Sequence, residues 1–315
     1  MTEDPPLAAQ PADLEPTGRQ IELNAAGYRA VVTEVGGRLR ELSWHGRHLV
    51  RTFAADQIPT LYSGAVLAPW PNRLAGGSYS FRGQPLQVPI NEVDRANALH
   101  GLVADRQWSI VEVSETSATL QLRLWPTEGY PFLLDLKLRY ALDNEGLTVE
   151  LAARNNGLDD APYGCSIHPY LVAGDGTVDD WTLRLSADSY LSVDPERLLP
   201  QGLQPVDEFD FREGRSLAGL VVDHAFTGLS ADAAGISSLQ LTAADGAGVT
   251  MSWARTTPWV QLCTADRPQP EFHRTGLAAE PMTCPPDAFN SGTDLVTLSR
   301  GDVHTTRIRI AGLSQ

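Results

Sequence analysis

The feature that most constrains the fold of this chain is a repeated alternation of apolar and polar residues. In residues 120–124 three leucines alternate with Gln121 and Arg123, and residues 134–139 repeat the pattern. Five further segments alternate in the same way: "LTVELAAR" (147–154), "WTLRL" (181–185), "LQLTA" (239–243), "VTMSW" (249–253) and "RIRI" (307–310). A period of two residues turns one face of a strand towards a core and the other towards water or a second layer. Each segment therefore predicts a β-strand.

Turn-forming residues separate these segments. Clusters of Asp, Asn and Gly occur at "ALDNEG" (141–146), "NNGLDD" (155–160), "AGDGT" (173–177) and "AADGAG" (243–248). Such clusters favour turns, and no long amphipathic helix lies between them. Many strands joined by turns predict an all-β protein, built as an antiparallel sandwich or barrel.

The amino-terminal residues differ in composition from the rest of the chain. Residues 1–18 contain four prolines and four acidic residues with little to bury, which predicts a flexible tail. Residues 19–315 show neither a fixed-period repeat nor an internal linker. Because all-β folds can reach this length as one domain, we expect a tail over residues 1–18 and a single β domain over residues 19–315.

The net charge and the cysteines limit the partners and the cellular compartment that we expect for the protein. A formal net charge of -15 repels phosphate backbones and anionic lipid, so we expect neither nucleic-acid nor membrane partners. The amino terminus lacks the basic and apolar regions of a signal peptide, and no apolar run approaches the roughly 18 residues of a membrane span. Three widely spaced cysteines do not form a disulfide framework. These features predict a cytoplasmic protein.

Common cofactor and nucleophile motifs are missing from the sequence. There is no P-loop, no G-x-G-x-x-G after a strand and no G-x-S-x-G elbow. Cys165 and His168 have C-x-x-H spacing, but no second pair follows at the distance of a zinc site, which needs four ligands. We therefore expect no metal and no cofactor.

Five motifs place one polar side chain each in rigid, apolar surroundings. They are Arg73 in "LAPWPNR", His100 in "NALHG", His168 in "YGCSIHPYL", Asp223 (beside His224) in "VVDHAF" and Glu280 in "LAAEPMTCPPDAFN". Taken singly, each has an ordinary explanation, such as a core histidine or an arginine paired with a carboxylate. Taken together, two imidazoles, an arginine and two carboxylates provide the groups of an acid–base site.

In this order, "PWPNR", "ALHG", "HPY", "DHAF" and "EPMTCPPDAFN" resemble the motifs of the aldose 1-epimerase (galactose mutarotase) family. The resemblance runs from about residue 20 to the carboxyl end. It implies a large antiparallel β-sandwich, the galactose mutarotase-like supersandwich. It also implies an isomerase that interconverts the α and β anomers of a free aldohexose.

The resemblance also implies roles for individual residues. Glu280 would be the catalytic base and His168 the catalytic acid. Arg73, His100 and Asp223 would hold the sugar. Two motifs depart from those of the galactose mutarotases, because "IHPYL" replaces an "NHTYFN"-like stretch and "EPMTCPPD" replaces E-T-Q-x-x-P-D. The chain therefore resembles a divergent bacterial branch of the family.

Mutarotation explains why such residues are needed. A base removes the proton of the C1 hydroxyl while an acid protonates the ring oxygen, and ring closure reverses both transfers. A carboxylate and an imidazolium can both exchange protons near neutral pH. Trp70, Trp253 and Trp259 are candidates to offer a flat apolar face to the pyranose, and we place Trp259 among the substrate-binding residues.

Three alternatives remain open at this point. A hexose 6-phosphate substrate would need a basic cluster, for which Arg73, Arg82 and Arg95 are available in one stretch. Glycoside hydrolysis by Asp223 and Glu280 would need carboxyl groups roughly 5–9.5 Å apart. A carbohydrate-binding or regulatory protein without catalysis would keep the same fold. The sequence does not distinguish a monomer from a homodimer.

Overall fold

The computed structural model describes residues 15–314, so most of the predicted tail lies outside the described residues. The last residues of this predicted tail, which the structure does describe, pack against the rest of the protein. Thr17 is buried, its hydroxyl donates to the carbonyl of Ala55, and its own carbonyl accepts the N–H of Val35. The packed region therefore begins before residue 19.

The largest element is an antiparallel nine-stranded sheet. In spatial order its strands are β10 (Ser109–Val113), β11 (Ser117–Leu124), β12 (Leu134–Asp143), β13 (Gly146–Asn155), β27 (Val303–Leu313), β23 (Gly248–Ala254), β22 (Ile236–Thr242), β17 (Thr182–Leu185) and β20 (Phe211–Ser216). Alternate residues of β12 are buried, as the alternation of apolar residues predicts.

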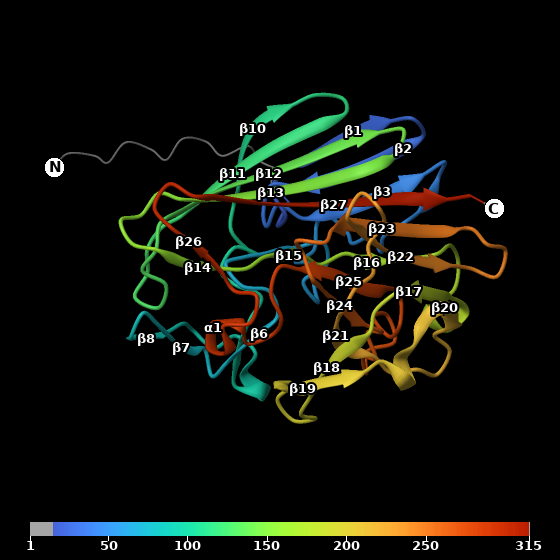
Figure 1. Ribbon diagram of the computed structural model, residues 1–315. Coiled ribbons are helices and arrows are strands. Elements are labelled where there is room, and N and C mark those ends of the chain that lie inside the picture. The colour runs from blue at the N-terminus through green and yellow to red at the C-terminus, as the bar shows by residue number, and fades with distance from the viewer. Residues whose placement is uncertain (1–14, 315) are drawn as a thin grey trace.

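A second antiparallel sheet has six strands. They are β16 (Tyr170–Leu171), β25 (Leu277–Met282), β24 (Trp259–Cys263), β21 (Asp223–Thr227), β18 (Ser189–Val193) and β19 (Pro200–Pro205). Figure 1 shows β11, β12, β13 and β27 across the top of the molecule, with β25, β24, β21 and β18 beneath them.

Smaller elements complete the described chain. A four-stranded sheet contains β1 (Gln20–Ala25), β2 (Tyr28–Thr33), β3 (Leu39–Trp44) and β4 (Arg47–His48). Four pairs are β5 (Val66–Leu67) with β15 (Ser166–Ile167), β6 (Arg73–Ala75) with β9 (Asn97–Leu99), β7 (Ser78–Phe81) with β8 (Gln84–Gln87), and β14 (Ala161–Tyr163) with β26 (Val296–Leu298).

Helical structure is confined to short segments. They are α1 (Ala288–Ser291) and the 3-10 turns η1 (Val93–Arg95), η2 (Val178–Asp180) and η3 (Asp207–Phe209). Within residues 15–314, no helix has the length and apolar character needed to cross a membrane. The predicted all-β fold with large antiparallel sheets is confirmed.

The two faces of the six-stranded sheet have different environments. Leu277 and Ala279 of β25 belong to the large core, which also contains Leu138 and Met251 of the nine-stranded sheet. On the opposite face, Ala278 and Met282 belong to two separate small apolar clusters. Because side chains alternate along a strand, Glu280 lies on this second face, between the two clusters.

Candidate active site

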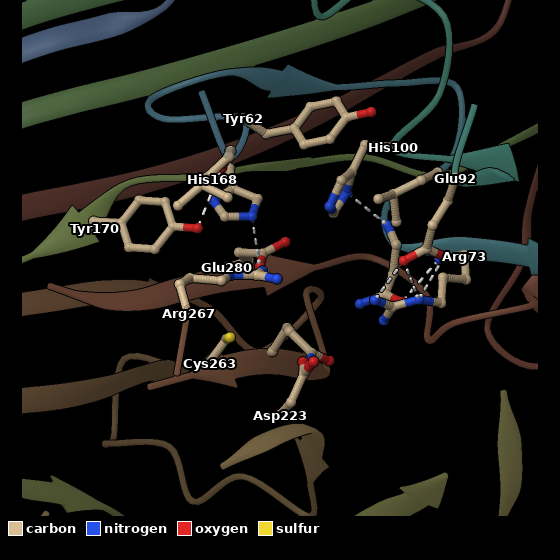
Figure 2. Close-up of a pocket in the computed structure, with 14 residues that line it drawn as sticks. Tyr62, Arg73, Glu92, His100, His168, Tyr170, Asp223, Cys263, Arg267 and Glu280 are labelled. Atoms are coloured by element: carbon tan, nitrogen blue, oxygen red, sulfur yellow. Dashed lines mark hydrogen bonds and ion pairs between the residues drawn. The ribbon is translucent and has the colours of Figure 1, made fainter. Parts of the chain in front are cut away.

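A cavity of about 240 Å³ opens on the second face of the six-stranded sheet. We call it the central cavity. Its lining residues are Leu61, Tyr62, Asn72, Arg73, Glu92, Leu99, His100, His168, Tyr170, Asp223, Gln261, Cys263, Arg267 and Glu280. Five of the six residues that the sequence analysis placed in the site therefore meet here (Figure 2), although they are spread over more than 200 positions of the chain.

Glu280 and His168 contact each other directly in the central cavity. Glu280 Oε1 lies 3.2 Å from His168 Nε2, and both residues are buried. Burial raises the pKa of Glu280 well above its ordinary value, an effect that Asp223 strengthens and Arg73 opposes. Burial also lowers the pKa of His168 to about 3. These shifts put the proton of the pair on Glu280 and leave His168 neutral.

The strands of the six-stranded sheet fix the carboxylates of the cavity. Glu280 of β25 lies opposite Gln261 of β24, and Asp223 of β21 lies opposite Cys263 of β24. The Gln261 amide donates to Asp223 Oδ1 at 2.7 Å. Glu280 Oε2 and Gln261 Oε1 are buried and accept no hydrogen bond from the described residues. Two oxygens at the cavity are therefore available to a polar ligand.

His100 is held in one tautomer by the backbone of Asn72. The backbone N–H of Asn72 donates to the ring atom His100 Nδ1 at 3.2 Å. The backbone N–H of His100 donates in turn to the backbone carbonyl of Asn72 at 2.9 Å. Because Nδ1 accepts a hydrogen bond, the ring proton of the neutral imidazole is on Nε2. Burial, His168 and Arg73 together keep the pKa of His100 well below its ordinary value. His100 is thus a neutral donor.

The glycine of the "ALHG" motif is required for steric reasons. Gly101 has a φ of +74°, and a Cβ at this position would lie 2.1 Å from the carbonyl oxygen of Ala68. Only glycine tolerates this close approach. The approach brings residue 100 beside the segment that carries Asn72.

Two tyrosines supply the aromatic surface of the central cavity. The ring of Tyr62 lies 4.6 Å from the ring of His100, and the ring of Tyr170 lies 5.1 Å from that of His168. Leu61 and Tyr62 both have a φ of +54°, a conformation uncommon for residues other than glycine and often found at functional sites. The Tyr170 hydroxyl donates to the carbonyl of Leu61, which helps to hold this segment.

Trp259, which the sequence analysis placed among the substrate-binding residues, does not line the central cavity. Trp259 is buried with Leu191, Ala225 and Met282, and its indole N–H donates to Asp294. It shares a strand face with Gln261 but lies roughly 7 Å further along the strand, beyond the cavity. The other two tryptophan candidates, Trp70 and Trp253, are buried in the large core.

Arg73, Arg82 and Arg95, which the sequence made available for a basic cluster, do not line the central cavity together. Arg82 pairs with Asp160 away from the central cavity, and Arg95 does not line it. Arg73 lines the cavity but is paired with Glu92 at 2.9 Å. Arg267, which the sequence analysis did not select, also lines the cavity. Its guanidinium makes no hydrogen bond or ion pair to the described residues, and its Nε is buried.

The cavity residues do not suit a metal ion. His100, His168 and Glu280 each offer a ligand atom within 4.8 Å of the others. However, His100 Nδ1 accepts the N–H of Asn72, and its Nε2 carries the proton, so neither nitrogen is a free ligand. Cys165 is directed elsewhere, with Sγ 3.3 Å from the hydroxyl of Thr306. Only two ligands remain, fewer than a zinc site requires.

Several lining residues carried little signal in the sequence. Tyr170 follows His168 and Pro169 in the "HPY" motif, so proximity in the sequence could have selected it. Gln261 lies in β24, whose sequence "WVQLC" is almost entirely buried and shows no alternation. Glu92 and Arg267 lie in loops, and only the folded chain brings them to the central cavity.

Comparisons with known proteins match the chain to one family. The family model described as aldose 1-epimerase matches residues 19–311. The uncharacterized protein YihR of Escherichia coli K12 is 40% identical, with 94% of each chain covered. The galactose mutarotase of Rattus norvegicus is 34% identical over 48% of this chain and 46% of its own, so that alignment spans about half of each protein.

Solved structures share the fold. A GalM/aldose epimerase homologue from C. elegans superposes with a TM-score of 0.83 at 20% identity, covering 94% of this chain and 98% of its own. Galactose 1-epimerase from Lactobacillus acidophilus NCFM gives a TM-score of 0.77 at 21% identity, with 92% of each chain covered. Since the family match extends over nearly the whole sequence, the chain belongs to the aldose 1-epimerase family.

Proposed function

We propose that the protein is an aldose 1-epimerase (mutarotase) that interconverts the α and β anomers of a free aldohexose. The observation that carries the proposal is the buried contact of 3.2 Å between Glu280 and His168. A carboxylate and an imidazole that share one proton are the acid and the base that ring opening needs. The family of the chain implies a sugar substrate, and a cavity of about 240 Å³ suits a molecule as small as a monosaccharide.

The proton transfers balance within this pair. When Glu280 is a carboxylate and His168 an imidazolium, Glu280 takes the proton of the C1 hydroxyl and His168 donates its proton to the ring oxygen. The bond between C1 and the ring oxygen breaks and leaves an aldehyde. Glu280 is then protonated and His168 neutral, which is the form that burial favours. After rotation about the C1–C2 bond, the reverse transfers close the ring on the other face.

Other lining residues match the hydroxyls of a sugar. His100 presents a neutral N–H as a donor. Asp223 has one oxygen committed to Gln261 and a second available to a hydroxyl. Tyr62 offers its ring beside both histidines, with ring centroids 4.6 and 6.4 Å away. The arrangement provides donors, acceptors and an apolar face around one reacting carbon.

Polarimetry or proton NMR of freshly dissolved α-D-glucose and α-D-galactose tests the proposal. We expect the wild type to accelerate equilibration and E280Q to lose roughly 100- to 10,000-fold in rate while calorimetry still detects sugar binding. The matched control is E34Q, because Glu34 is also buried but pairs with Arg19 outside the cavity. If E280Q equilibrates the anomers as fast as the wild type, Glu280 is not the base.

A second candidate is an aldose with an anionic group, such as a hexose 6-phosphate. Arg267 favours it, because an unpaired guanidinium in a cavity is a natural partner for an anion. Equilibration of D-glucose 6-phosphate should then exceed that of D-glucose, and R267Q should lower the ratio of the two kcat/KM values. An unchanged ratio argues against this substrate. A wild type that binds these sugars without equilibrating them would be a non-catalytic sugar-binding protein.

A further inference from the structure

Glu92 and Arg73 form a two-point ion pair on one side of the central cavity (Figure 2). The Arg73 Nε donates to Glu92 Oε2 at 2.9 Å, and its Nη2 donates to Glu92 Oε1 at 3.0 Å. The side chains are only 11% and 13% exposed. Two parallel hydrogen bonds fix the orientation of a guanidinium as well as its position.

Glu92 is itself held by a short bridge. Its backbone pairs with that of Asn97 through N–H to carbonyl contacts of 3.1 and 3.2 Å, and the Asn97 amide donates to Glu92 Oε2 at 3.1 Å. Asn97 begins β9, which pairs with the strand β6 that begins at Arg73. Arg73 therefore lies in this small sheet, and Glu92 is bridged to it through Asn97.

A distant loop closes over this bridge. Arg197, between β18 and β19, donates to the carbonyls of Arg95 and Ala96 at 3.0 and 2.8 Å and to the side-chain oxygen of Asn97 at 3.0 Å. The Asn97 amide in turn donates to the carbonyl of Arg197. The turn that presents Glu92 is thus anchored to the six-stranded sheet as well as to β6.

The ion pair determines what Arg73 can offer to a ligand. The N–H of Nε and one N–H of Nη2 are used by Glu92, whereas Nη1 and the second N–H of Nη2 make no hydrogen bond to the described residues. An arginine otherwise retains much rotamer freedom, and a buried guanidinium without a partner is strongly disfavoured. The free edge formed by Nη1 and the second N–H of Nη2 can still donate to the oxygens of a ligand.

We infer that Glu92 is a positioning residue that orients Arg73, so that the free edge of its guanidinium, formed by Nη1 and Nη2, faces a hydroxyl of the bound sugar. The inference rests on the proposed function, since it assigns a role within the same site. Glu92 acts through Arg73, and the effect of changing Glu92 therefore depends on the presence of Arg73.

A double-mutant cycle tests this dependence. We expect E92Q to lower kcat/KM for D-galactose roughly 10- to 100-fold, mainly through KM, because a displaced group near the substrate loses about this much. E92D, which keeps the charge, should recover part of the loss. In an R73Q background, E92Q should change kcat/KM by less than about threefold, since coupled residues are not additive. Losses that multiply would overturn the inference.

Binding measurements separate this inference from the proposed function. Calorimetry gives the Kd of D-galactose and D-glucose for the same four proteins, with E34Q as a control that should leave the Kd unchanged. If the wild type binds sugar without equilibrating the anomers, the proposed function fails while the coupling in Kd still tests Glu92. If E92Q does not fold, the cycle is measured with the wild type, E92D, R73Q and the double variant of E92D and R73Q. A wild type that binds neither sugar overturns both proposals.

Discussion

Burial is the largest of the effects that decide which member of the Glu280–His168 pair carries the proton. In water an imidazole binds a proton more tightly than a carboxyl group. In the central cavity the order is reversed, because removal from water penalises both charged forms. The neutral pair is then favoured over the ionic pair, and the proposed function requires that a bound sugar stabilise the ionic form by donating to the carboxylate.

The protonation of His168 can be measured directly. Because its pKa is about 3, we expect its imidazole NMR signals to remain those of a neutral ring between pH 7 and pH 4. Imidazoles of the unfolded chain titrate near 6.5. H168N assigns the signals by their loss. A titration of these signals near pH 6.5 would contradict the assignment of a buried neutral histidine.

Glu280 should make stability depend on pH with a definite sign. A carboxyl group whose folded pKa is raised binds more protons in the folded state, so its contribution becomes less favourable as pH rises above the ordinary value of 4.5. E280Q removes this penalty. We expect E280Q to unfold at a higher temperature than the wild type at pH 7, and the difference to shrink towards pH 4.5. Each kcal/mol is worth on the order of 2–4 °C for a chain of this size class.

The matched variant for this measurement is E34Q. In the wild type, hydrogen bonds from Arg19 are the main cause that lowers the pKa of the Glu34 carboxylate to about 2. Loss of this carboxylate should therefore destabilise the protein at pH 7. Opposite signs for two buried glutamates would show that the environment, not burial alone, sets the effect. A lower melting temperature for E280Q at pH 7 would contradict the raised pKa.

Individual residues differed in how far the sequence could predict them. Glu280 and His168 were found because short motifs resemble those of a family. Trp259 was selected as a flat apolar face for a sugar, but residue type does not give the distance along a strand to a cavity, and Trp259 does not line this one. Glu92 could not be found, since its partner Arg73 lies 19 positions away across a turn whose path depends on Arg197.

Loops attached to strands position part of the site, and Arg274 anchors the most important one. This buried residue lies in the loop between β24 and β25, which also carries Arg267. Its guanidinium donates to Asp179, to Asp266 and to the carbonyls of Leu217 and Leu220. The loop is thereby fixed at the rim of the central cavity.

Removing this anchor should affect both stability and binding. We expect R274Q to lower the free energy of unfolding by roughly 1–3 kcal/mol, because several hydrogen bonds to a charged group are lost, and to weaken sugar binding. Urea unfolding and calorimetry measure the two effects. The control is R123Q, whose two-point pair with Asp135 is solvent-accessible and should contribute less than about 1 kcal/mol. If R274Q and R123Q lose equal free energies of unfolding, Arg274 does not anchor the loop more strongly than a solvent-accessible ion pair would.

Strands with one exposed face were predictable, and others were not. The alternation in β12, β13, β22, β23 and β27 reflects a sheet with one face on the core. Strand β25 is buried throughout, so its sequence "LAAEPM" lacks alternation, although it carries Glu280. The two-residue strands β5, β15 and β16 form only where distant segments meet, and local sequence holds no sign of them.

At the scale of the whole molecule, the central cavity lies where rigid and irregular parts meet. Glu280, Gln261 and Asp223 lie on adjacent strands of the six-stranded sheet, whose other face packs in the large core. Residues of the amino-terminal third, such as Tyr62, Arg73 and His100, cover the cavity from the opposite side. A well-packed sheet supports the acid–base pair, while the covering segments bring groups that can contact a sugar.

The path of the chain argues for one cooperative unit. Strands β17, β20, β22 and β23 belong to the nine-stranded sheet, whereas β18, β19, β21, β24 and β25 belong to the six-stranded sheet. The chain thus passes repeatedly between the sheets, and no single cut would separate them. The single domain expected for residues 19–315 remains a prediction that this interleaving supports.

Unfolding by urea tests the prediction of a single domain, because a single cooperative unit loses all its spectroscopic and binding signals at the same urea concentration. Tryptophan fluorescence reports on both sheets, since Trp253 lies in the large core and Trp259 lies in β24 of the six-stranded sheet. Far-UV circular dichroism follows the strands, and sugar binding follows the site. We expect one midpoint for all three. L138A, in the core of the nine-stranded sheet, should lower the free energy of unfolding by about 2–5 kcal/mol and shift the three midpoints equally. A shift in fluorescence with unchanged sugar binding would divide the molecule into two units.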